Sequence, residues 1–131
     1  MRPTLPDTLY HYTCTDRAPG IRADRELVPN YQPWIGWPLV WLTDMDTPDK
    51  AALGLTARHL LRCDRTAVRC TVARHPAVQP WWLWVRNADV DLLSRDLYEA
   101  AEGAAPAHWW VSMVPLPVAE VYDLTAEQVG A

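Results

Sequence analysis

The sequence predicts an α+β fold whose strands pair mostly antiparallel. Segments typical of strands outnumber those with helical periodicity, and the helices are too few to supply the crossovers of a doubly wound parallel sheet. The chain has 131 residues, half of them hydrophobic, which is enough to build one core without disulfides or a metal. We therefore expect a single domain spanning residues 1–131.

Residues 9–13 alternate and are rich in aromatic side chains, which indicates a short strand. Thr15 and Asp16 are candidate caps for a short helix that ends at Asp24, with Pro19 in its first turn, where the missing N–H costs little.

Residues 29–38 contain three prolines and are predicted to form a loop. Its aromatic side chains either wall a pocket or cover the edge of a sheet. They are Tyr31, Trp34 and Trp37. The next segment, residues 39–43, is a nearly continuous apolar run, which is typical of a strand buried on both faces.

The rest of the chain is expected to add two helices and four strands. One helix begins at Thr47 and Pro48. The other begins at Asp89 and runs to about residue 101, with Leu92, Leu93, Leu97 and Ala100 on one face. Strands are expected at residues 66–72, 78–85, 108–114 and 118–124. The segment at 108–114 follows a loop of small residues. The segment at 78–85 carries Trp81, Trp82 and Trp84, for which packing in the core is favoured over stacking on a partner.

Composition excludes several classes of protein. A formal net charge of −4 argues against a basic nucleic-acid-binding module. Cys14, Cys63 and Cys70 form no CxxC pair and are odd in number, which favours a reducing compartment. No stretch approaches the roughly 18 apolar residues of a membrane span, and no export signal is recognised, so we expect a cytoplasmic protein with no membrane association.

Several familiar sites are absent from the sequence. There is no phosphate loop, no HExxH and no GxSxG. The four histidines lack the spacing of metal ligands, so no metal site is expected. They are His11, His59, His75 and His108.

Three fragments in order carry a resemblance to a known family. They are residues 9–13, residues 39–44 followed by a helix, and residues 108–111 running into a final strand at 121–124. Together they resemble the ADP-ribosyltransferase superfamily, which includes RNA 2′-phosphotransferases and DNA-modifying toxins. The resemblance implies split antiparallel β-sheets with a few flanking helices. It also implies that NAD or a related nucleotide is bound in a cleft between the sheets.

The resemblance assigns roles to particular residues. His11 would hydrogen-bond a ribose hydroxyl of NAD, and Trp41 would stack on the nicotinamide, where many members have Tyr. Further cofactor contacts are expected from neighbours on the same strands and from the aromatic loop. These are Tyr12, Thr13, Thr43, Tyr31 and Trp34.

The late strand departs from the family pattern. Many transferases place a Glu there to stabilise the oxocarbenium-like transition state, whereas this chain has His108, with Glu102 six residues earlier. Either residue is a candidate to act at the ribose 2′-hydroxyl.

Three functions therefore remain open. The first is an enzyme that transfers ADP-ribose to a nucleic acid or protein, or that acts on a related ribose-phosphate substrate. The second is a non-catalytic module of the same fold that recognises a nucleotide, a modified base or a partner protein. The third is a small phage or defence-system factor whose exposed tryptophans bind a partner. The oligomeric state is not indicated.

Overall fold

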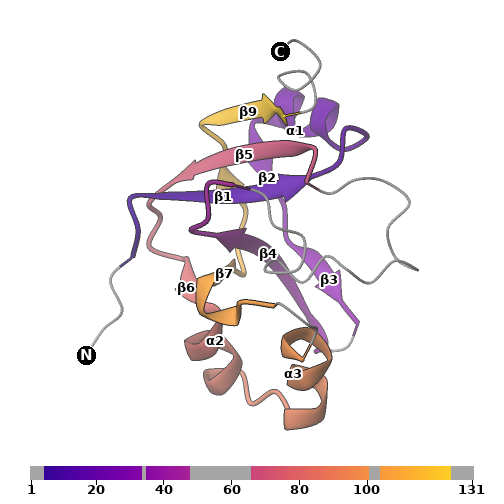
Figure 1. The fold of residues 1–131 in the computed structure, drawn as a ribbon, viewed down its shortest axis with the longest axis vertical. Helices are drawn as coiled ribbons and strands as arrows, with labels where there is room; N and C mark the ends of the chain where they lie inside the picture. The colour runs from indigo at the N-terminus through magenta and orange to yellow at the C-terminus, as the bar shows by residue number, and fades with distance from the viewer. Residues whose placement is uncertain (1–4, 34, 48–65, 101–103, 125–131) are drawn as a thin grey trace.

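The computed structural model describes residues 5–33, 35–47, 66–100 and 104–124 (Figure 1). These residues form a mixed α+β structure whose strands all pair antiparallel, which confirms the α+β class and the antiparallel pairing expected from the sequence. The main sheet has the order β6-β7-β4-β1-β5-β9, with β3 paired to β4. Its strands are β1 (Thr8–Thr13), β3 (Asn30–Gln32), β4 (Trp37–Thr43), β5 (Val68–Ala73), β6 (Gln79–Pro80), β7 (Trp109–Ser112) and β9 (Glu120–Asp123).

A second, two-stranded sheet and three α-helices complete the described structure. The small sheet pairs β2 (Glu26–Leu27) with β8 (Leu116–Pro117). The helices are α1 (Ala18–Asp24), α2 (Trp81–Asn87) and α3 (Leu92–Glu99), and a single 3-10 turn, η2 (Pro106–His108), precedes β7. In Figure 1, α2 and α3 lie together at the opposite end of the molecule from α1. No helix within the described ranges is long and apolar enough to cross a bilayer.

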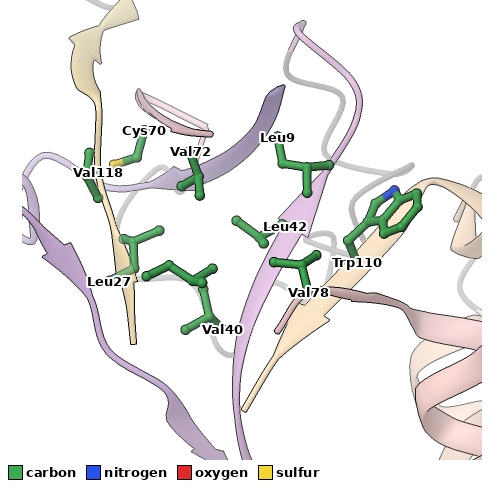
Figure 2. Packing of buried hydrophobic residues seen from close by; sticks show 10 residues of the cluster. Leu9, Leu27, Val40, Leu42, Cys70, Val72, Val78, Trp110 and Val118 are labelled. Atoms are coloured by element: carbon green, nitrogen blue, oxygen red, sulfur yellow. The ribbon is translucent and has the colours of Figure 1, made fainter. Parts of the chain in front are cut away.

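Buried apolar side chains form two main cores, one on each face of the main sheet, and a small third cluster of Ala18, Ala67 and Val68. Residues alternate between the faces of a strand, so Val40 and Leu42 on β4 contribute to the first core while Leu39 and Trp41 contribute to the second. The first core packs against β2, β8 and α1, and Figure 2 shows its side chains. It comprises Leu9, Leu27, Val40, Leu42, Cys70, Val72, Val78, Trp110, Leu116 and Val118.

The second core joins the β4–β7 part of the sheet to α2 and α3. It comprises Leu39, Trp81, Trp84, Val85, Trp109 and Val111, with Trp41 and Tyr98 packed against it.

The strongest apolar segments were the easiest to predict. The strands expected at residues 9–13 and 39–43 are β1 and β4. The strand expected at residues 66–72 is β5, shifted by one or two residues. The two closing strands correspond to β7 and β9, each shorter than expected. The helix expected after Thr47 falls at residues 48–65, outside the described residues.

Two predictions of secondary structure were wrong. The expected strand at residues 78–85 is only the two residues of β6, followed by the helix α2. Burial of Trp81, Trp84 and Val85 follows the i, i+3, i+4 period of a helix, which the strand propensity of tryptophan obscured. The expected loop at residues 29–38 contains β3, which pairs back onto the start of β4 as a hairpin.

The ends of two helices also differ from expectation. Helix α1 does end at Asp24, but it begins at Ala18 with no side-chain cap, so neither Thr15 nor Asp16 caps it. Helix α3 is capped by Asp91, whose carboxylate accepts from the Ser94 amide, and not by Asp89, which has a φ of 56°.

The leucine face predicted for α3 points to solvent. Leu92 and Leu93 are more than 70% exposed and Leu97 is 52% exposed. Only Tyr98 of this helix packs against the second core. An amphipathic pattern predicts a helix with an apolar face but does not say what covers that face.

Burial in the first core predicts an unreactive thiol at Cys70. The side chain is fully buried, and this desolvation raises the pKa from 9.0 to about 11. Because the thiolate is the nucleophile, a pKa raised by that much lowers the reactive fraction about a hundredfold at pH 8. We expect peptide mass spectrometry to detect alkylation of Cys70 by iodoacetamide at least about a hundredfold more slowly in the folded protein than in urea.

The same shift has a consequence for stability. As pH rises above 9, the unfolded chain loses the Cys70 proton while the folded chain keeps it up to about 11. Ionisation of the thiol therefore stabilises the unfolded state, and the free energy of unfolding falls as the pH rises from 9 to about 11. Equal alkylation rates for the folded and unfolded protein would contradict both statements.

Candidate functional site

The clearest polar cluster in the described structure lies where β4 ends and β7 begins. Thr43 is paired with Trp109, so the next residue on each side, Asp44 and His108, come together at one end of the sheet. The amide of Asp44 donates to the carbonyl of His108 at 3.4 Å. The side chains meet as well, with 2.6 Å between His108 Nδ1 and Asp44 Oδ1.

A third side chain fixes the other oxygen of Asp44. The indole Nε1 of Trp110 donates to Asp44 Oδ2 at 3.2 Å. Trp110 belongs to the first core and is only 6% exposed, so it ties the carboxylate to a rigid part of the sheet. Figure 2 shows its indole at the edge of that core, beside Leu42 and Val78.

This geometry selects one tautomer of a neutral His108. An ionised carboxylate accepts hydrogen bonds only, so the Nδ1 of a neutral His108 must carry the proton and donate it to Asp44. The other nitrogen, Nε2, is then left with a lone pair. The His108 side chain is 50% exposed, and that of Asp44 is 29% exposed. A histidine oriented by a carboxylate and open to solvent is suited to general acid–base catalysis.

His11 lies deeper in the sheet and is engaged by backbone. Its Nδ1 lies 2.7 Å from the carbonyl oxygen of Trp41 on β4. In the described residues, β1 is registered with β4 through one pair, Tyr10 with Thr43, whereas its register with β5 runs through six pairs. The His11 ring thus meets a β4 carbonyl beyond the point where the two strands are paired.

The prediction that His11 and Trp41 line one crevice is wrong. His11 is registered with Cys70, so it lies on the sheet face of the first core. Trp41 lies on the other face, where its ring packs against those of Trp81 at 4.9 Å and Tyr98 at 5.6 Å. The spacing of residues along β1 and along β4 did not reveal whether His11 and Trp41 lie on the same face of the sheet.

Three other predicted contacts are buried and used within the protein. Thr43 Oγ1 accepts from the amide of Met45, and the Tyr12 hydroxyl donates to the Met45 carbonyl. Burial raises the pKa of Tyr12 to about 12, partly opposed by the nearby guanidinium of Arg69. Thr13 is 3% exposed. The Tyr12 and Thr43 side chains hold the segment that follows β4.

The hairpin formed by β3 and β4, which carries Tyr31, is remote from His108. Tyr31 is 65% exposed and is paired with Pro38 on β4. Asp44 lies six residue steps after Pro38, which corresponds to about 20 Å of extended chain. Tyr31 and His108 therefore lie at opposite ends of β4 and do not wall one pocket. Trp34 and Glu102 lie outside the described residues.

Two residues of this region were not predicted. Asp44 was recognised only as the end of an apolar run, and its partner is 64 residues away, so no local pattern links them. Arg69 was not among the predicted site residues. Its guanidinium lies 5.4 Å from the ring centroids of both Tyr10 and Tyr122.

Comparison of the chain with protein-family models, curated proteins and solved structures finds no match. Within the described parts of the chain, no group of three or more His, Cys, Asp or Glu side chains is arranged to hold a metal ion.

Proposed function

We propose that this chain is an ADP-ribosyltransferase-like enzyme that acts on NAD or a related ribose-containing nucleotide, with His108 as its acid–base group and Asp44 as the residue that orients it. ADP-ribose would pass to a nucleic acid or protein acceptor, and to water in the absence of one. The observation that carries the proposal is the 2.6 Å contact between His108 Nδ1 and Asp44 Oδ1.

The proposed chemistry uses the lone pair of His108 Nε2. When the bond from nicotinamide to ribose breaks, an acceptor hydroxyl or a water molecule attacks the ribose and must lose a proton. His108 takes that proton while Asp44 stabilises the resulting imidazolium. This role differs from that of a late-strand glutamate, which stabilises the oxocarbenium-like carbon by its own negative charge.

A binding module without turnover is the second candidate. It is favoured by the packing of Trp41, whose ring contacts Trp81, Tyr98 and Trp109 and would have to leave them to stack on nicotinamide. Under this alternative a nucleotide is recognised near His108 and no bond is broken.

Two measurements on the purified protein separate these candidates. Calorimetry with NAD up to millimolar concentration measures binding, and chromatographic assay of free nicotinamide measures turnover. The enzyme predicts saturable binding and nicotinamide release above the spontaneous rate. Binding without release supports the module, and the absence of both rejects NAD as the ligand.

A further inference from the structure

The segment from Thr43 to Asp46, at the end of β4 and just beyond it, is held by hydrogen bonds from within the segment and from side chains on β1 and β5. Within the segment, Thr43 Oγ1 accepts from the Met45 amide at 3.1 Å. From β1, the Tyr12 hydroxyl donates to the Met45 carbonyl at 2.9 Å. From β5, Arg69 Nη1 donates to the Asp46 carbonyl at 2.6 Å. Asp44 lies in the middle of this segment.

The two donors from the sheet are themselves fixed. Tyr12 and Arg69 are direct cross-strand neighbours on β1 and β5, and Tyr12 is only 8% exposed. The Arg69 guanidinium lies over the rings of Tyr10 and Tyr122, an arrangement in which the ring faces attract the cation. The backbone after Asp44 is therefore anchored to side chains that have little freedom to move.

We infer that Tyr12 and Arg69 are positioning residues that hold the carboxylate of Asp44 against His108. This inference rests on the proposed function, because it concerns the same acid–base pair. The Met45 amide and carbonyl are fixed by Thr43 and Tyr12, so the peptide that follows Asp44 has one orientation. Tyr12 thus acts on the site through the backbone of Met45.

The test follows the His108 Nδ1 proton by NMR in protein labelled with ¹⁵N-histidine. The Tyr12→Phe variant keeps the ring and loses the hydroxyl. The Tyr10→Phe variant makes the same change two residues earlier on the same strand face, at a hydroxyl with no hydrogen-bond partner among the described residues. Since one hydrogen bond shifts an equilibrium by about three- to tenfold, we expect this proton to exchange with water about three- to tenfold faster in Tyr12→Phe. In Tyr10→Phe we expect less than about a twofold change.

Arg69 is tested by a conservative and a non-conservative change. Arg69→Met removes the donor to the Asp46 carbonyl, and we expect a change in exchange of the same direction as in Tyr12→Phe. Arg69→Lys keeps a positive charge and a donor, so we expect it to restore part of the protection. Backbone amides of α2 serve as the internal reference, because general loosening of the fold would accelerate their exchange too.

The outcomes separate this inference from the proposed function. If Asp44→Asn leaves the His108 signal unchanged, the pair itself is absent in solution and the proposed function loses its basis. If the signal depends on Asp44 but Tyr12→Phe behaves like Tyr10→Phe, the positioning role is overturned while the pair stands. Equal acceleration at His108 and at the α2 amides also overturns it, because the effect is then merely structural.

Discussion

Replacing Trp81 by Ala is expected to lower the free energy of unfolding by about 3–5 kcal/mol, because it removes a fully buried indole from the centre of the second core. The ring of Trp81 contacts those of Trp41, Trp84, Tyr98 and Trp109. The methyl group of alanine leaves most of the volume of the indole empty. A loss of this size is a large part of the roughly 5–15 kcal/mol by which domains are stable.

The neighbouring tryptophan provides the control. Trp82 occupies the next position of α2 and is 42% exposed, with Arg86 over its ring. Trp82→Ala is expected to cost less than about 1 kcal/mol, since it loses one exposed cation–π contact and little packing. Urea denaturation of both variants, followed by circular dichroism, measures the difference. A Trp81→Ala variant as stable as Trp82→Ala would contradict the described second core.

His108→Gln is expected to lower the rate of nicotinamide release about a hundred- to ten-thousandfold, the range typical of removing a general acid or base. Glutamine keeps a polar side chain of similar length but has no group that takes up a proton near neutral pH. Asp44→Asn is expected to lower the rate about ten- to a hundredfold, because an amide no longer selects the imidazole form that leaves Nε2 free.

A histidine elsewhere on the surface serves as the matched control. His75 precedes β6, and its Nδ1 accepts from the Ala77 amide. His75→Gln makes the same chemical change away from the candidate site, so its rate is expected to stay within about twofold of the unaltered protein. If His108→Gln retained the full rate, or if His75→Gln lost as much, His108 would not be the acid–base group.

The sequence predicted the parts of the fold that depend on local pattern. β1 and β4 were found because alternating or continuous apolar residues specify strands directly. Trp81–Asn87 was misassigned because aromatic residues favour strands on average, and here the contacts of an α2 helix with the sheet outweighed that preference. The leucines of α3 were predicted to share one face, but periodicity does not reveal whether that face packs against the core.

The candidate site was less accessible to prediction, because its geometry depends on pairing between distant segments. His108 was identified as a candidate, but Asp44 was not, since only the β4–β7 register brings the two together. The placement of His11 and Trp41 on opposite faces depends likewise on the register of three strands. The spacing of residues along a single strand does not specify its register with the neighbouring strands.

The central claim is that a nucleotide meets His108 at the end of β4. NMR titration of the ¹⁵N-histidine-labelled protein with NAD tests this most directly, because the four histidines report separately on different parts of the chain. We expect a saturable shift of the His108 ring signals, which is absent or strongly weakened in Asp44→Asn, and no shift of the His75 signals. Unchanged His108 signals at millimolar NAD would contradict it.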